Sequence, residues 1–411
     1  MFALIFLGIS SGLPLELTGR ALQAWMTVEK VDLATIGAIS LVGTPYLFKW
    51  AWAPLLDRYI PPFLGRRRGW ILIMQILLAA ALAFMSTHDP QNALKIVAIT
   101  AVVIAFLSAT QDIAIDAYRT DVLEYKEMGA GAALFVMGYR IALIGVIGLA
   151  FILADRLSWP TVYLIMAGVM LVNMIVTWRA PEPVLQEAPP KTLASAVYLP
   201  FKDFFSRTGA GIGVLVLLFI VIYKVPEYMA QNMATPFLLK IGFSLTEIGA
   251  VQGVLGIIMT IVGTIVGGVA VSKIGINKSL WSFAILGAAS NIMFFLLTLV
   301  GKNHAMLVAA VVIENFCLGL VNGVFLAFMM SMCNPQFSAT QFALLSSLMA
   351  TSRVWIVAPA GALVERVGWH NYFLIALAAV LPSLLLLPLV APWRMEQPRF
   401  AAKHTGEVKN A

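Results

Sequence analysis

Long apolar stretches follow one another along almost the whole chain, separated by short polar segments. Most are about 18 or more residues long, which is the length that a helix needs to cross a hydrocarbon layer of about 30 Å. The stretches are continuous rather than alternating, which favours helices over the strands of a membrane barrel. The pattern predicts twelve transmembrane helices, at residues 1–26, 34–56, 70–85, 93–118, 131–154, 159–178, 210–237, 246–271, 280–300, 305–332, 341–364 and 372–392.

The composition excludes a water-soluble fold. Hydrophobic residues make up 61% of the chain and charged residues only 11%, whereas soluble proteins carry about 25% charged residues. The first apolar stretch shows no small-residue cleavage pattern, so we expect it to remain as the first helix rather than to be a signal peptide.

The net charge of +7 reflects membrane topology rather than nucleic-acid binding. Sixteen Lys and Arg residues fall in the predicted loops on one side and six in those on the other. The positive-inside rule therefore predicts a multi-pass protein of the bacterial inner membrane with both termini in the cytoplasm.

Cys317 and Cys333 are the two cysteines, and on one helix they would lie about 24 Å apart, too far for a disulfide. The four histidines fall in loops, helix ends or the tail, so we expect no metal site. The chain also lacks the residue pattern of an intramembrane hydrolase, and we do not expect an enzyme.

Internal similarity divides the chain into two halves. Leu33–Ala38 resembles Leu245–Ala250, and Ala154–Trp159 resembles Val364–Trp369, at offsets of 212 and 210 residues. A polar break rich in proline and charge separates the halves. A parallel six-plus-six repeat is typical of the all-α major facilitator fold, in which two halves rock about a central site. The predicted domains are an N-terminal half at 1–179, a cytoplasmic linker at 180–209, a C-terminal half at 210–393 and a cytoplasmic tail at 394–411.

The loop after the second predicted helix combines an acidic residue with a run of arginines. This order resembles the loop motif of major facilitators, in which the charges latch one conformation. An arginine-rich cytoplasmic loop without that role is the alternative. The candidate latch residues are Asp57, Arg58, Arg66, Arg67 and Arg68.

Charges within the membrane are concentrated in predicted helices one, four, seven and ten, which line the central cavity in the major facilitator fold. A charge at a helix centre costs about 2.5–3.5 kcal/mol, so each needs a partner or a function. Asp112 and Asp116 are i,i+4 neighbours and repel each other, so we expect one to pair with Arg119 or Arg140 and the other to exchange a proton. The proton-coupling candidates are Asp112, Asp116, Glu314 and Glu16. Structural ion pairs between helices are the alternative.

Polar and aromatic residues on the same helices supply the groups that a bulky polar solute needs. Lys224 and Arg20 are suited to a substrate carboxylate, unless each pairs internally with Glu227 or Glu16. Aromatic rings can stack on a sugar, and Pro14 and Pro226 can kink helices one and seven. The substrate-binding candidates are Arg20, Gln23, Trp25, Arg140, Tyr223, Lys224, Glu227, Tyr228, Gln231, Asn232, Gln252, Asn315 and Asn322.

Five runs resemble the AmpG muropeptide permeases: Ser11–Leu15, Leu22–Thr27, Pro61–Trp70, Ala109–Leu123 and Phe337–Ser346. The resemblance implies an importer of anhydro-muropeptides, N-acetylglucosaminyl-1,6-anhydro-N-acetylmuramic acid with or without its stem peptide. Such transport serves cell-wall recycling and β-lactamase induction, and depends on the proton gradient. Glu227 departs from the family, where Asp is expected.

From this resemblance we expect a small glycopeptide substrate, a lipid bilayer and no nucleic acid as partners, with a proton as the coupled ion and no cofactor. We expect the protein to act as a monomer. The alternatives are a transporter of another bulky amphiphile, such as an acetyl-CoA-like or siderophore solute, and a non-transporting receptor.

Overall fold

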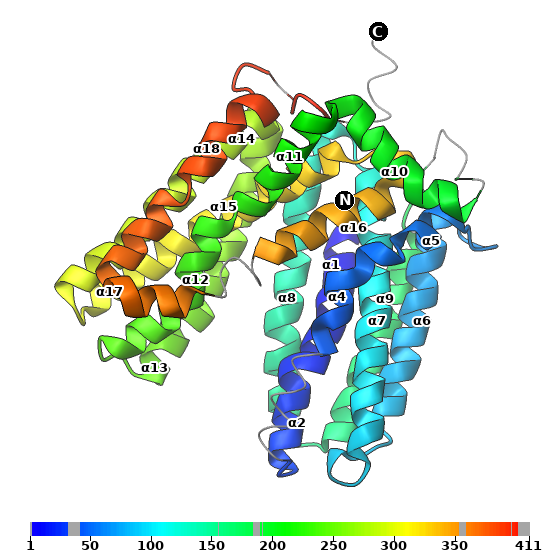
Figure 1. The fold of residues 1–411 in the computed structure, drawn as a ribbon. Coiled ribbons are helices and arrows are strands. Elements are labelled where there is room, and N and C mark those ends of the chain that lie inside the picture. The colour runs from blue at the N-terminus through cyan, green and yellow to red at the C-terminus, as the bar shows by residue number, and fades with distance from the viewer. Residues whose placement is uncertain are drawn as a thin grey trace. The chain divides into compact units, whose positions relative to one another are not determined.

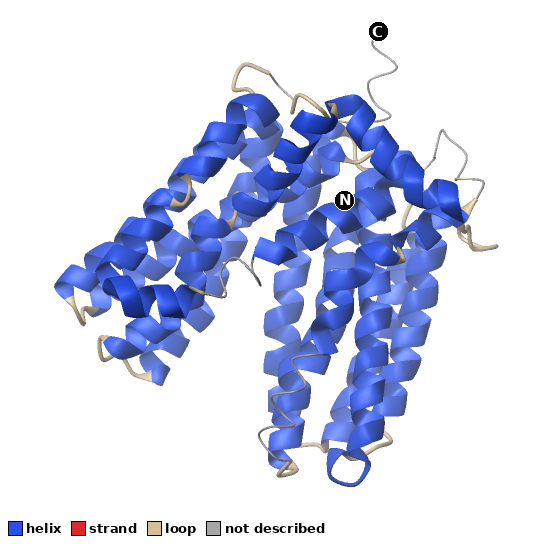
Figure 2. Cartoon of the chain, in the orientation of Figure 1, coloured by secondary structure: helices blue, strands red, loops and turns tan. Residues whose placement is uncertain are grey.

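The computed structural model describes residues 2–31, 42–154, 156–183, 190, 192–352, 359–395 and 397–401, with the backbone alone at 20, 144–148, 151, 245 and 246. These residues form helices and loops, with no strand among them (Figure 1, Figure 2). In them, seven helical stretches are long and apolar enough to cross a membrane, so the chain is a multi-pass membrane protein. The number of twelve spans stays a prediction, because residues 34–41 of the second one lie outside the described residues.

The helices of the first part of the chain follow the predicted apolar stretches. They are α1 (Ala3–Glu16), the π-helical segment η1 (Leu17–Ala21), α2 (Leu22–Val28), α4 (Thr44–Phe48), the 3-10 turn η3 (Lys49–Ala51), α5 (Ala53–Arg58), α6 (Arg66–Met85), α7 (Pro90–Val122), the 3-10 turn η4 (Tyr125–Glu127), α8 (Met128–Ala154) and α9 (Trp159–Arg179).

The later helices continue the pattern. They are α10 (Leu193–Thr208), α11 (Ala210–Ile222), α12 (Val225–Lys240), α13 (Leu245–Ile248), the π-helical segment η5 (Gly249–Gly256), α14 (Ile257–Val300), α15 (His304–Met332), the 3-10 turn η6 (Pro335–Phe337), α16 (Ser338–Thr351), α17 (Ala360–Ala378) and α18 (Leu381–Val390).

Helix α10 was not predicted from the sequence. It lies within the polar break at 180–209 and exposes an apolar stripe of Leu193, Val197 and Tyr198. Charged residues such as Lys202 and Asp203 interrupt its hydrophobic pattern, and at 16 residues it is shorter than a membrane-spanning helix.

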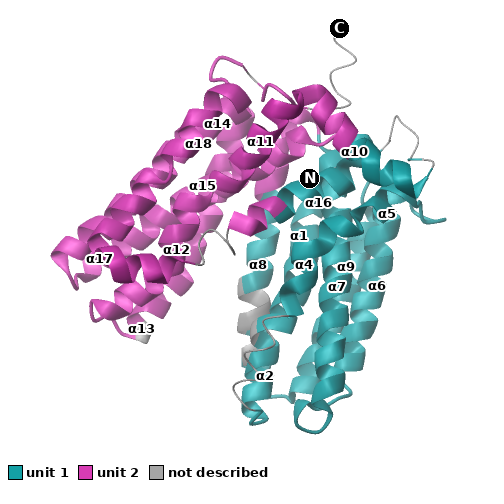
Figure 3. Ribbon diagram, in the orientation of Figure 1, with its two compact units in different colours: residues 1–123, 134–200, 335–347 teal, residues 124–133, 201–334, 348–411 magenta. Residues whose placement is uncertain are grey.

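The chain forms two compact units (Figure 3). Unit 1 comprises residues 1–123, 134–200 and 335–347, and unit 2 comprises residues 124–133, 201–334 and 348–411. Each unit therefore includes one short segment from the other end of the chain. The domain boundaries expected from the sequence describe two consecutive halves, and they stay a prediction.

In unit 1, α6 packs against α7 and α9, and α1 packs against the same two helices. Their shared core includes Leu82, Trp25, Tyr163 and Met166. The opposite side of α9 exposes large apolar side chains, such as Val172. Exposed apolar surface of this extent is unfavourable in water and favourable in lipid, which agrees with a membrane helix.

In unit 2, α14 packs against α15 and α17, and α11 packs against α18. The core contains stacked and edge-to-face aromatic rings, among them Phe237, Phe294 and Phe373. Tyr372 is fully buried in the same cluster, and its hydroxyl donates to the carbonyl oxygen of Met229 at 2.8 Å. This bond satisfies its one polar group.

Two glycines divide long helices at the loops expected from the sequence. Gly275 in α14 has a φ of 83° and Gly368 in α17 a φ of 77°. Glycine adopts such angles without the steric cost of a side chain. The two positions lie between predicted helices eight and nine and between predicted helices eleven and twelve, so α14 and α17 are each broken at a loop that the sequence predicted.

Helices one and seven are interrupted near their prolines, as predicted. The π-helical segment η1 begins three residues after Pro14, and helix seven is broken at residues 223–224, between α11 and α12, with Pro226 at the second position of α12. A second π-helical segment, η5, carries Gln252. Such segments locally reshape a helix and are frequent at functional sites.

Candidate functional site

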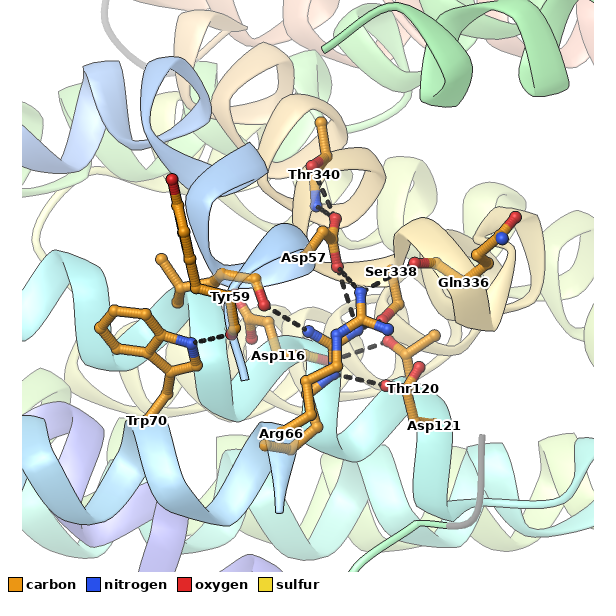
Figure 4. A network of polar contacts seen from close by, with 12 residues as sticks. Asp57, Tyr59, Arg66, Trp70, Asp116, Thr120, Asp121, Gln336, Ser338 and Thr340 are labelled. Atoms are coloured by element: carbon orange, nitrogen blue, oxygen red, sulfur yellow. Dashed lines mark hydrogen bonds and ion pairs between the residues drawn. The ribbon is translucent and has the colours of Figure 1, made fainter. Parts of the chain in front are cut away.

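Asp57 forms the centre of a buried charge network that we call the latch cluster (Figure 4). Its side chain is fully buried in the last turn of α5. Its Oδ1 atom accepts hydrogen bonds from Arg66 Nη2 at 2.7 Å and from Arg67 Nη2 at 3.1 Å. Both arginines lie in the first turn of α6, so the network connects the two helices on either side of one loop.

The latch cluster also binds the start of α16. Thr340 donates to Asp57 Oδ2 from its backbone nitrogen at 2.8 Å and from its hydroxyl at 2.6 Å. Arg67 donates to Ser338 Oγ at 2.7 Å and to Asp121 Oδ2 at 2.6 Å. Four helices, α5, α6, α7 and α16, are thus joined through one aspartate and one arginine.

Arg68 and Arg58, also predicted for the latch, lie elsewhere. Arg68 donates to the carbonyl oxygen of Trp178 at 3.0 Å and pairs with Glu182 at 3.4 Å. Glu182 also accepts from the backbone nitrogens of Arg67 and Arg68, at 2.8 and 3.1 Å, and so caps α6. The Arg58 guanidinium lies 5.4 Å from the centre of the Tyr59 ring.

The two aspartates of α7 have different partners within unit 1. Asp116 is buried and accepts from Lys49 Nζ at 3.2 Å and from Arg119 Nη2 at 2.9 Å. Asp112 is half-buried and accepts from Ser11 Oγ at 2.6 Å. The sequence left open which aspartate pairs and whether its partner is Arg119 or Arg140, and in the structure Asp116 pairs with Arg119.

Arg119 is fully buried beneath two aromatic rings. Its guanidinium carbon lies 4.2 Å from the ring centre of Phe135 and 5.2 Å from that of Phe342. These contacts stabilise a desolvated cation, as cation–π interactions do. Lys49 was not among the residues expected at a site, although a single cation in an apolar helix is a signal that could have identified it.

Four further candidates lie in unit 1. Glu16 is buried on α1, Gln23 and Arg140 are half-buried on α2 and α8, and the side chain of Arg20 lies outside the described residues. Their roles stay predictions.

Unit 2 carries a second set of charged and polar residues on α12 with its N-cap and on α15, which we call the α12–α15 cluster: Lys224, Glu227, Tyr228, Glu314 and Asn322. Lys224 is the N-cap residue of α12, and its Nζ donates a short hydrogen bond to Asn322 Oδ1. The same nitrogen lies 3.6 Å from Glu227 Oε2 and 5.0 Å from the ring centre of Tyr228. The internal pairing of Lys224 with Glu227 is therefore present in this structure.

The remaining polar candidates of unit 2 are distributed more widely. Asn315 accepts from Thr260 at 3.2 Å, and Gln252 accepts from Thr235 at 3.1 Å. Gln231 and Asn232 are exposed on α12. The structure brings Lys224, Glu227, Tyr228 and Asn322 together, but gives no shared contact for these other four residues.

Trp25 and Tyr223 are packing residues in this structure, which differs from the surface for a sugar that the sequence suggested. Trp25 is 1% exposed, and its ring packs against Trp159 and Tyr163. The Tyr223 ring stacks on Phe325 at 4.9 Å, and its hydroxyl donates to a backbone carbonyl. Neither ring has an exposed face here, because the neighbouring helices cover it.

Both cysteines are buried free thiols. Across the described residues, no group of three His, Cys, Asp or Glu side chains is arranged to hold a metal ion.

Comparison with known proteins identifies the family of this chain. The sequence model of the Major Facilitator Superfamily matches residues 1–359. The "Anhydromuropeptide permease" of Escherichia coli strain K12 is 48% identical over 93% of this chain and 78% of its own length. The chain belongs to the AmpG permease family of the major facilitator superfamily. A "Putative transporter AmpG 4" of Rickettsia felis is a more distant AmpG relative, 31% identical over 94% of this chain and 95% of its own length.

Solved structures agree with the fold of this AmpG-family chain. A bacterial homologue of the iron transporter ferroportin, in an outward-facing state, superposes with a TM-score of 0.70 over 95% of this chain and 98% of that one. The transporter FucP, in its outward conformation, gives 0.69 over 94% and 97%. Both are 14% identical in sequence, so they show the fold alone. The chain is a membrane transporter rather than an enzyme.

Proposed function

We propose that this chain is an inner-membrane permease that imports anhydromuropeptides for cell-wall recycling by alternating access. The observation that carries the proposal is the 48% identity, over 93% of the chain, to a protein named for this activity. The matched region spans nearly the whole chain, whereas the solved major facilitators of the same fold are only 14% identical.

The residues of the α12–α15 cluster suit such a cargo. A disaccharide with a carboxylate and a peptide offers amide and hydroxyl groups, and the cluster presents side chains that can hydrogen-bond them, such as Asn322 and Tyr228. The charge balance is mixed rather than strongly positive, which favours a zwitterionic cargo over a polyanion.

We also propose that import is driven by the proton gradient and that the protein acts as a monomer with both termini in the cytoplasm. Asp112 is the proposed proton carrier, because it accepts a hydrogen bond from the neutral Ser11 hydroxyl, whereas Asp116 is held by two cations. A carboxylate without a cation partner exchanges its proton more readily than one in an ion pair.

Uptake of labelled anhydro-disaccharide, with and without its stem peptide, tests the proposal in bacteria that lack their own anhydromuropeptide permease. We expect accumulation against a gradient that stops when a protonophore is added. Absence of uptake, with the protein present in the membrane, would refute the substrate. Accumulation that persists with the protonophore would refute proton coupling.

A further inference from the structure

The buried carboxylates of the α12–α15 cluster lack hydrogen-bond donors. Glu314 is 7% exposed on α15, and its Oε1 atom has no hydrogen-bond partner among the described residues. Glu227 is 8% exposed in the first turn of α12, and neither of its carboxylate oxygens receives a hydrogen bond from that part of the chain. The hydrogen bond from Lys224 to Asn322 joins the start of α12 to α15, the two helices that carry these glutamates. Buried carboxylates in proteins are normally satisfied by donors, so this pair has unused acceptor capacity.

The cluster also has an excess of acidic groups. Lys224 is the cation that the structure places beside Glu227, and its Nζ donates to Asn322 while remaining 3.6 Å from Glu227. That distance is longer than a normal hydrogen bond. One ammonium for two carboxylates leaves a net charge of −1 when both are ionised.

A primary ammonium group fits these requirements. It brings three N–H donors and one positive charge, so it can satisfy the unused oxygens and neutralise the cluster. A carboxylate or phosphate would instead add negative charge, and a sugar hydroxyl would donate one bond without neutralising anything. A hard metal cation needs several more oxygen ligands, and the adjacent lysine would repel it.

We propose that Glu227 and Glu314 form a subsite for a primary ammonium group on the peptide part of the transported substrate. The proposal rests on the proposed function, because it requires a cargo that carries a peptide. It gives Glu314 a role in cargo recognition, whereas the sequence suggested proton coupling. The peptide-free disaccharide has no ammonium group and does not need this subsite.

The test measures initial uptake rates of three labelled probes: the anhydro-disaccharide, its peptide-bearing form with a free amino group, and the same form with that amino group acetylated. In the wild type, we expect the free amine to be preferred over the acetylated probe. In Glu314→Gln, we expect uptake of the free amine to fall roughly tenfold, since a charge-assisted hydrogen bond is lost, while disaccharide uptake is maintained.

Glu247→Gln is the matched control, because it is the same substitution on a partly exposed glutamate of unit 2 that pairs with Lys302 and His304. It should leave the preference for the free amine unchanged. Glu227→Gln gives the same test if Glu314→Gln does not accumulate in the membrane, and the abundance of every variant is measured by immunoblot.

Three results would overturn the subsite: an equal loss for all three probes, no loss for the free amine, or a wild type that does not distinguish the free from the acetylated amine. An equal loss would assign Glu314 to proton coupling. Failure of the wild type to transport any probe is a separate result, which refutes the proposed function and the subsite with it.

Discussion

Asp116 in unit 1 and Glu227 in unit 2 are both buried carboxylates on transmembrane helices, but their surroundings differ. Asp116 accepts hydrogen bonds from Lys49 and Arg119 at 3.2 and 2.9 Å. Glu227 accepts none from the described residues, and its nearest cation, Lys224, is 3.6 Å away. The first acid is fully engaged in holding α7 to its neighbours, while the second retains acceptor capacity.

The same contrast separates structural acids from those available to a ligand. Asp57 in unit 1 receives bonds from Arg66, Arg67 and Thr340, and so connects helices. Removing one partner of such a buried pair leaves an uncompensated charge. The intact network therefore holds the helices firmly together. An acid with unused oxygens can instead gain its partners when cargo or a proton arrives.

Asp112 is intermediate between these cases, and its substitution should have the largest effect. In Asp112→Asn, we expect gradient-driven accumulation to be abolished, because the amide cannot carry a proton, while exchange of cargo across the membrane continues. Both are measured in membrane vesicles with labelled disaccharide. Full accumulation in the variant would show that another group carries the proton.

Substitution of Arg67 tests the two aspartates that it binds, Asp57 and Asp121. Arg67→Met leaves Asp121 without its guanidinium and Asp57 with Arg66 as its remaining arginine. We expect unfolding free energy to fall by about 3–5 kcal/mol, measured by thermal unfolding of the purified protein in detergent. Arg58→Met is the control and should stay within about 0.5 kcal/mol, since Arg58 contacts Tyr59 rather than the latch cluster. Equal losses would contradict the assignment.

The two lysines provide a direct comparison of the clusters. Lys49→Met leaves Asp116 bonded to Arg119, so we expect a loss of about 1–3 kcal/mol. Lys224→Met removes the cation beside Glu227, and the loss should lie at or above the upper end of that range. The midpoints of thermal unfolding at pH 7 give the order. A larger effect for Lys49 would reverse our interpretation of the two sites.

The smallest effect is expected at Glu247, a partly exposed residue near the start of helix eight that pairs with Lys302 and His304. The backbone N–H of Ser244 and then the side chain of His304 lower the pKa of Glu247 to about 2. Because the folded pKa lies below the unfolded value of about 4.3, the stabilising contribution is present at neutral pH and is lost as the pH falls from about 4 towards 2.

Glu247→Gln should therefore lower the unfolding midpoint slightly at pH 7, and the difference from the wild type should shrink as the pH is lowered through that range. Thermal unfolding at a series of pH values provides the measurement. A difference that stays constant with pH would show that the carboxylate charge does not contribute.

The sequence predicted the membrane helices well because their signal is local. Apolar length alone decides whether a segment crosses lipid, so α6, α7, α9 and α15 lie where the hydropathy pattern places them. Gly275 and Gly368 likewise occur in expected loops. Helix α10 was not predicted, because charged residues interrupt its apolar pattern.

The candidate site was only partly predictable. The i,i+3 pair of Asp116 and Arg119 follows from helix geometry. Lys49 and Thr340 meet aspartates, and Ser338 meets Arg67, only through folding. Each lies 67 or more residues away from its partner in the sequence. No local pattern identifies such a partner.

The sequence by itself determined that this protein spans a membrane, that it has a repeated helical architecture, and which helices carry intramembrane charge. These properties depend on hydropathy and on spacing within single helices. The tertiary structure decided which of those charges are satisfied. Whether a buried carboxylate finds a donor depends on side chains from distant helices, and this separates the engaged Asp116 from Glu227 and Glu314, whose oxygens remain available.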